Sequence, residues 1–189
     1  MNNIQTGQKF NTAKLVLTWN CNMACSYCCN EQKALRDTFI PIRQSELKDL
    51  PHDDIELTGG ELTLSQYFSW TTEFLRNDLP KGRNYYFYTN GVHLTTWNAI
   101  ILKEDGVKGI NVGFHPNQPV TFHGGESTVL LKKLDWQRLW EIHNILPIRL
   151  WVQDLDYRSW MDDLGYPIKI WKLGDCDKIT TDRYVLSFK

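Results

Sequence analysis

The sequence predicts an α/β fold in which parallel strands form a partial (β/α)6 barrel with the helices outside. Short apolar strands alternate with longer amphipathic segments, and no hairpin signal separates successive strands. Strands that alternate with helices pair in parallel through right-handed crossovers. Eight such units do not fit in 189 residues, so an open barrel is favoured over a closed one. A doubly wound sheet is the alternative.

Each element is predicted from its apolar pattern and its flanking residues. The expected strands are 14–19, 54–59, 84–90, 109–115, 148–153 and 168–173. The expected helices are 44–50, 65–77, 94–104, 127–143 and 157–164, and the fourth is expected to break near Asp135. Ser65 and Ser127 suit N-caps, whereas Gly106 and Gly165 suit left-handed C-caps.

Length and composition favour one globular domain over residues 1–189. We divide it into an amino-terminal extension (1–13), the barrel (14–173) and a carboxyl-terminal tail (174–189). A net charge of −1 does not favour a nucleic-acid partner. Because the chain has neither a long apolar run nor a signal sequence, we expect no membrane association and a cytoplasmic location. A cysteine cluster in that compartment indicates metal binding or redox chemistry more than disulfides.

Residues that follow parallel strands are expected to gather at one edge of the barrel, where ligands bind. Four cysteines follow the first strand, and Gly59-Gly60-Glu61 follow the second. Thr89-Asn90-Gly91 follow the third strand, and His115 begins a long loop after the fourth. These segments therefore form one predicted mouth.

Cys21, Cys25 and Cys28 have the spacing C-x3-C-x2-C, which allows three thiolates to surround one centre. A [4Fe-4S] cluster held by three cysteines leaves one iron open to another ligand. Structural zinc is the alternative, but it needs a fourth ligand, and Cys176 stands alone. Cys29 is interpreted as a buried free thiol, with a ligand role as its alternative.

Three motifs together carry a resemblance to a known family. The segment CNMACSYC resembles the C-x3-C-x-aromatic-C signature of the radical S-adenosylmethionine superfamily, with Tyr27 as the aromatic residue. ELTGGEL at 56–62 resembles its GGE motif, and YTNG at 88–91 resembles a segment often found after its third strand. The superfamily core is also a six-unit partial barrel.

The resemblance implies two cofactors, a [4Fe-4S] cluster on Cys21, Cys25 and Cys28 and S-adenosylmethionine on its open iron. It implies that the GGE segment receives the amino group of the cofactor. The cofactor-binding residues that it implies are Tyr27 near adenine, Gly59, Gly60 and Glu61 at the amino group, Thr89, Asn111, and Trp171 to Leu173 near the adenine edge. Gly113 stands where relatives often carry a polar ribose ligand, so Asn111 or His115 is expected to replace it.

The resemblance also implies an enzyme that cleaves S-adenosylmethionine reductively to a 5′-deoxyadenosyl radical, which abstracts hydrogen from a substrate. The long segment 115–127 suits a flap that contacts this substrate, with a solvated surface loop as the alternative. The substrate-side candidates are His115, Gln118, His123, Arg149 and Gln153. Arg149 is also open to interpretation as a surface residue.

A radical enzyme of this kind implies an electron donor such as a flavodoxin or a ferredoxin. About sixteen residues follow the sixth expected strand, so we expect a macromolecular substrate, a partner chain or self-association to help close the mouth. Two other functions stay open: an activase for a glycyl-radical enzyme, acting on a partner protein, and a non-catalytic metal-binding or partner-binding module. The tryptophans of the expected helices, Trp70, Trp97, Trp140 and Trp160, are interpreted as core residues.

Overall fold

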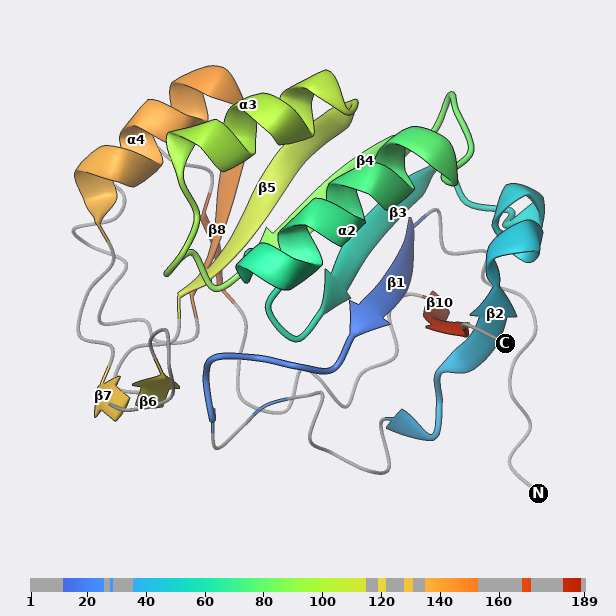
Figure 1. The fold of residues 1–189 in the computed structure, drawn as a ribbon, viewed down its shortest axis with the longest axis horizontal. Coiled ribbons are helices and arrows are strands. Elements are labelled where there is room, and N and C mark those ends of the chain that lie inside the picture. The colour runs from blue at the N-terminus through green and yellow to red at the C-terminus, as the bar shows by residue number, and fades with distance from the viewer. Residues whose placement is uncertain are drawn as a thin grey trace.

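Eight strands form one sheet in a computed structural model that describes residues 12–25, 28, 36–114, 119–121, 128–130, 135–152, 168–170 and 182–187. The strand order is β2-β10-β1-β3-β4-β5-β8-β9, and every neighbouring pair is parallel (Figure 1). Their bounds are β1 Thr12–Thr18, β2 Ile40–Arg43, β3 Asp54–Gly59, β4 Asn84–Thr89, β5 Val107–Phe114, β8 Ile148–Val152, β9 Ile168–Ile170 and β10 Asp182–Ser187.

Three helices lie on one face of this sheet (Figure 1): α2 (Ser65–Asn77), α3 (Thr96–Glu104) and α4 (Trp136–Ile145). The ring of Phe87 in β4 packs edge-on against Phe68 of α2, with ring centroids 6.3 Å apart. Phe114 of β5 packs in the same way against Trp136 of α4, with centroids 5.6 Å apart. Because strand side chains alternate between faces, Ile110 and Leu150 join the same apolar core. The predicted α/β partial barrel with helices outside is confirmed.

The six expected strands are all present, but the sheet has two more. β10 comes from the predicted tail and pairs with β1, where Leu15 lies opposite Tyr184. β2 then pairs with β10, where Ile42 lies opposite Leu186. Neither strand was expected from the sequence, because a short strand at or near a sheet edge carries little apolar pattern of its own.

The segment 115–127 was expected to be irregular, and that expectation was wrong in part. β6 (Pro119–Thr121) and β7 (Thr128–Leu130) form an antiparallel pair, in which Val120 lies opposite Val129. Both strands contain the β-branched residues valine and threonine, which favour extended backbone. The expectation of no hairpin therefore fails here.

Helices α2 and α3 largely follow the expected ranges, but the expected helix 127–143 is wrong over its first part, because Thr128–Leu130 form β7. Ser127, the expected helix 157–164, Trp160 and Gly165 lie outside the described residues.

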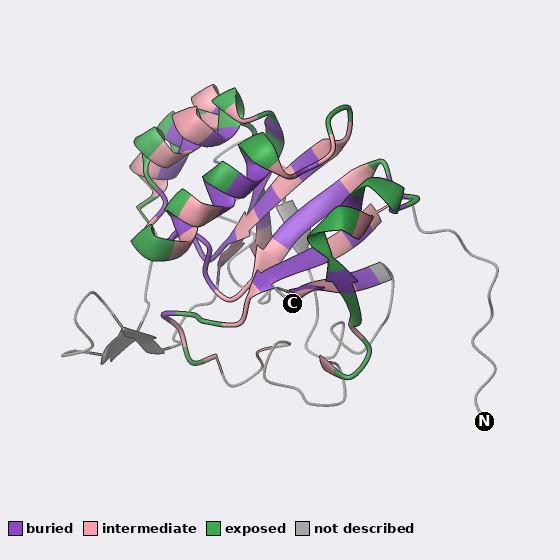
Figure 2. Ribbon diagram, turned by 45° about the vertical axis from the view of Figure 1, so that its right-hand side comes forward, coloured by how far each residue is buried: buried purple, intermediate pink, exposed green. Residues whose placement is uncertain are grey.

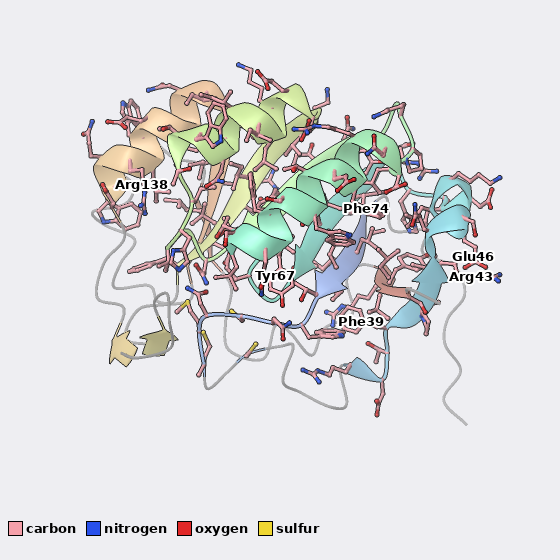
Figure 3. All side chains as sticks on the ribbon, viewed as in Figure 1. Phe39, Arg43, Glu46, Tyr67, Phe74 and Arg138 are labelled. Atoms are coloured by element: carbon pink, nitrogen blue, oxygen red, sulfur yellow. The ribbon has the colours of Figure 1, made fainter. Side chains whose placement is uncertain are left out.

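The N-cap of α2 is Leu64 rather than Ser65, and it makes no side-chain capping bond. The Asp135 carboxylate accepts a hydrogen bond from the Arg138 backbone N–H at 3.0 Å and so begins α4 at the predicted break. Segment 44–50 forms a 3₁₀ helix, η2 (Gln44–Asp49). The side chain of its N-cap residue, Arg43, pairs with that of Glu46 in its first turn (Figure 3).

Two tryptophans expected in the core are exposed instead. Trp97 is 65% exposed and Trp140 is 44% exposed. In Figure 2 exposed residues recur along the helices, whereas buried residues follow the strands. In the described part of the chain the helices form a single layer over the sheet, and Trp97 lines a hollow together with Phe68 and Thr72 of α2. Trp70 is half-buried and stacks on Phe74, with ring centroids 5.3 Å apart. No helix in the described ranges is both long and apolar enough to span a membrane.

Candidate functional site

The carboxyl ends of β1, β3 and β4 bring the predicted motifs together at one edge of the sheet. Thr18 at the end of β1 pairs with Gly59 at the end of β3, and β3 pairs with β4 along its length. The cysteine loop leaves β1 directly after this pair. Three motifs that are far apart in the sequence are therefore neighbours.

The cysteine loop presents Cys21, Cys25 and Cys28 as free thiols, and the Cys28 backbone N–H donates to the Cys25 carbonyl at 3.0 Å. Although much of Cys21 is exposed, partial desolvation of its thiol is the largest cause of a pKa raised to about 11. Desolvation, followed by the charges of Cys28 and Cys21, raises the pKa of Cys25 to about 12. The thiols are thus close enough to oppose one another's ionisation.

Three thiolates on one loop need a positive centre to stabilise them, and the set matches a cluster that takes three cysteine ligands. Within the described residues, no group of three or more histidine, cysteine, aspartate and glutamate side chains is close enough to hold a metal ion. The donor set therefore fits such a cluster by its chemistry, and the three sulfurs must converge for it to bind.

Gly59 and Gly60 lie against the cysteine loop so closely that no side chain fits. A Cβ atom on Gly60 would lie 1.7 Å from the carbonyl oxygen of Asn20, and one on Gly59, whose φ is 142°, would lie 2.1 Å from that of Thr18. The backbone N–H of Gly60 donates to the Thr18 carbonyl oxygen, and that of Glu61 donates to the Asn20 carbonyl oxygen, each at 2.7 Å. The close approach that glycine permits here is to the chain itself.

The carboxylate of Glu61 is 1% exposed and accepts four hydrogen bonds. Oε1 accepts from the Thr63 N–H at 2.9 Å, the Thr63 hydroxyl at 2.5 Å and the Thr89 hydroxyl at 2.7 Å. Oε2 accepts from the Asn90 N–H at 2.7 Å. Burial raises the pKa of Glu61, while these bonds lower it. The hydroxyl of Thr89 donates to Glu61, so the structure brings these two predicted cofactor residues together.

Asn90 connects the segment after β4 to the cysteine loop. Its amide Nδ2 donates to Oδ1 of Asn22 at 2.8 Å, and its Oδ1 accepts from the Val92 N–H at 3.0 Å. From α4, Nη2 of Arg138 donates to the carbonyls of Gly91 and Val92, at 3.2 and 3.3 Å, and its helix position is labelled in Figure 3. The side chain of Asn20 also donates to the Tyr67 hydroxyl of α2. The cysteine loop is thus bonded to the segment after β3, the segment after β4 and helix α2.

Asn111 and Arg149 lie opposite each other in β5 and β8, on the sheet face that points away from the helices. Asn111 is 2% exposed, and its Nδ2 has no hydrogen-bond partner among the described residues. Arg149 is exposed. The structure thus brings this predicted cofactor residue and this predicted substrate residue together.

The remaining predicted site residues lie outside the described ranges. They are Tyr27, His115, Gln118, His123, Gln153, Trp171 and Leu173, together with Cys29 and Cys176.

Sequence reasoning missed Asn22, Thr63 and Arg138, which hold the loops, and also Lys14, Glu56 and Tyr88. The last three were detectable, because a charged or polar residue in the middle of an apolar strand marks a second, polar face. The loop residues carry no such signal, since their partners are far away in the sequence.

No family model matches the chain. The GTP 3′,8-cyclase of Synechococcus sp. (strain CC9902) is 32% identical over 113 residues, which cover 56% of this chain and 32% of the cyclase. The probable GTP 3′,8-cyclase of Methanocella arvoryzae is 33% identical over 113 residues, which cover 56% of this chain and 34% of that cyclase. The chain therefore spans about a third of the length of the curated relatives it matches.

Among solved structures, SuiB of Streptococcus suis bound to S-adenosylmethionine has a TM-score of 0.55 at 11% identity, covering 94% of this chain and 47% of SuiB. This likeness shows the fold alone. The ordered motifs and the curated relatives nevertheless agree with the resemblance of this chain to the radical S-adenosylmethionine superfamily.

Proposed function

We propose that this chain binds a [4Fe-4S] cluster through Cys21, Cys25 and Cys28, binds S-adenosylmethionine beside it, and acts as a radical enzyme. The observation that carries this proposal is the meeting of the cysteine loop, the GGE segment and the TNG segment at one edge of the sheet. When bound, the reduced cluster supplies the electron that cleaves the cofactor to methionine and a 5′-deoxyadenosyl radical, which abstracts hydrogen from the substrate.

The residues of this chain position and shield that chemistry. The bonds of Gly60 and Glu61 to Thr18 and Asn20 fix the start of the cysteine loop, and Asn90 holds Asn22 within it. Backbone atoms of Gly59 and Gly60 are also proposed to lie beside the amino group of the cofactor. We propose that His115, the alternative to Asn111 for this role, reaches the ribose side, with Tyr27, Trp171 and Leu173 near adenine.

Cofactor cleavage tests the proposal directly. The protein is reconstituted with iron and sulfide under anaerobic conditions, reduced with dithionite in the presence of S-adenosylmethionine, and assayed for 5′-deoxyadenosine. We expect wild type to form it and Cys21→Ala, Cys25→Ala and Cys28→Ala each to lose at least about a hundredfold in rate. Cys176→Ala, which removes a thiol outside the loop, serves as the matched control. Zinc without iron in the purified protein would favour the non-catalytic module.

The substrate and the electron donor are further proposals. We propose a flavodoxin or a ferredoxin as donor, which is tested by replacing dithionite with either reduced protein. A solved neighbour, anSMEcpe with bound S-adenosylmethionine and the Cp18Cys peptide, has a TM-score of 0.52 at 12% identity and covers 86% of this chain and 51% of its own. It supports a peptide or protein substrate as one candidate, including the activase alternative. Deuterium transfer from labelled candidates into 5′-deoxyadenosine identifies the hydrogen donor.

A further inference from the structure

The sheet has a polar face opposite the helices, which we call the inner face and define by Lys14, Glu56, Tyr88, Asn111, Arg149 and Trp151. Phe87 and Phe114 contact helices, so their neighbours in each strand point the other way. Tyr88 lies opposite Asn111, and Asn111 lies opposite Arg149. These three side chains therefore form a row across β4, β5 and β8.

Two members of this row have hydrogen-bond donors without an acceptor. Arg149 is exposed, and its guanidinium makes no hydrogen bond or ion pair with the described part of the chain. The buried Nδ2 of Asn111 also lacks a partner there. A buried N–H without an acceptor is unfavourable, because folding removed the water that it would otherwise bind. Both groups are donors, so the ligand that suits them carries acceptor oxygens.

The charges on the inner face indicate that the ligand is negatively charged. The Glu56 carboxylate is already occupied, since Lys14 Nζ lies 3.8 Å from Oε2 and the Tyr88 hydroxyl donates to Oε1 at 3.3 Å. Asp54, nearer the amino end, accepts from Nδ2 of Asn84 at 2.8 Å. Arg183 lies beside Lys14 in register on β10 and adds a further positive charge. The carboxylates of Glu56 and Asp54 therefore both have partners other than Arg149.

Aromatic rings stand beside this charge. Tyr88 and Trp151 are 5.6 Å apart between ring centroids, and Lys14 lies over both rings. An arginine offers two parallel N–H donors to a planar carboxylate or to a phosphate, and the neighbouring rings would contact the apolar part of the same molecule. Together these groups form a binding surface with a defined orientation.

We propose that Arg149 and Asn111 bind an anionic oxygen group, a carboxylate or a phosphate, on the substrate. This inference rests on the proposed function for the existence of that substrate. Arg149 lies three residues before the end of β8, which is about 10 Å from the carboxyl edge at the rise of a parallel strand. The substrate therefore carries its anion about that far from the carbon that reacts at the mouth.

Equilibrium dialysis of the full chain with radiolabelled inorganic phosphate tests the site without any turnover. We expect saturable binding by wild type, a loss of at least tenfold in affinity in Arg149→Gln, and partial retention in Arg149→Lys. Arg43→Gln is the matched control, because it removes the same charge from an exposed arginine that is already paired with Glu46. Glu56→Gln should bind phosphate more tightly, since it removes a negative charge and releases Lys14.

Two competitors identify the anion. Competition by acetate assigns a carboxylate, and its absence assigns a phosphate. Displacement of phosphate by S-adenosylmethionine would instead assign the site to the cofactor and overturn the substrate proposal. No saturable phosphate binding by wild type, or equal weakening in Arg149→Gln and Arg43→Gln, also overturns it. The separate 5′-deoxyadenosine assay shows whether the proposed function itself has failed, because phosphate binding does not require cofactor cleavage.

Discussion

The Oε2 atom of Glu61 accepts a hydrogen bond of 2.7 Å from the backbone N–H of Asn90. This bond joins the segment after β3 to the segment after β4, and the other oxygen of the same carboxylate binds Thr63 and Thr89. All four groups that bond to Glu61 are donors. The ionised carboxylate is therefore the form that matches its surroundings, even though burial raises its pKa.

Glu61→Gln should destabilise the protein by about 2 kcal/mol, the typical cost of leaving a buried donor unsatisfied. The amide NH₂ of glutamine would face either the Asn90 N–H or the Thr63 and Thr89 donors, whichever way it turns. Urea unfolding followed by circular dichroism measures the change in the free energy of unfolding. Glu73→Gln, on the exposed side of α2, should stay within about 0.5 kcal/mol of wild type. Equal stabilities of the two variants would show that the donors around Glu61 find other acceptors.

Gly60→Ala should be among the most damaging single substitutions in the chain. Its Cβ would lie 1.7 Å from the Asn20 carbonyl oxygen, which is a backbone atom that cannot rotate away. We expect a loss of more than about 4 kcal/mol, or failure to fold. Gly82→Ala is the control: Gly82 has a φ of 85° but nothing within 4 Å of the added atom, so it should cost only about 1–2 kcal/mol. Thermal unfolding compares the two, and a Gly60→Ala protein as stable as Gly82→Ala would contradict the packing described here.

Much of the fold was predictable, because the central strands are short apolar segments that alternate along the sequence with amphipathic helical segments. β3 and α2 lie at the expected residues, and the Asp135 cap marks the expected break before α4. β10 was not predictable in the same way. It is a strand because β1 and β2 offer it hydrogen-bond partners on both sides, and that is a property of the assembled sheet.

The candidate site was predictable as a set of motifs but not as a set of contacts. Short-range spacing placed the cysteines and the glycines at one edge. It could not show that Glu61 binds Thr89, since 28 residues separate them. It also could not show that Gly60 approaches Asn20, because a pair of glycines after a strand is equally compatible with a tight turn, a contact with a ligand and a contact with another part of the chain.

Arg138→Met should loosen the segment after β4 while keeping α4 helical. Methionine has good helix propensity and retains the apolar stem, but it removes the donor to the Gly91 and Val92 carbonyls. We expect a loss of about 1–2 kcal/mol in unfolding free energy and faster amide hydrogen exchange at residues 90–92. Gln137→Met, a neighbouring exposed position on the same helix, should change neither quantity. Unchanged exchange at residues 90–92 in Arg138→Met would show that α4 does not support this segment.

Tyr85 should make stability fall at high pH. Its hydroxyl donates to the Pro80 carbonyl at 2.6 Å, and burial raises its pKa to about 12 from an ordinary value of 10.0. The folded protein therefore keeps this proton where the unfolded chain loses it. The stabilisation is complete below pH 10 and disappears as the pH rises toward 12. Tyr85→Phe lacks the hydrogen bond, so it should be less stable than wild type by about 1 kcal/mol at neutral pH. As the pH rises from 10 to 12, wild type should lose stability relative to Tyr85→Phe, so the difference between their unfolding free energies should shrink and then change sign. Urea titrations at several pH values measure that difference, and one that stays constant up to pH 12 would mean that Tyr85 ionises alike in both states.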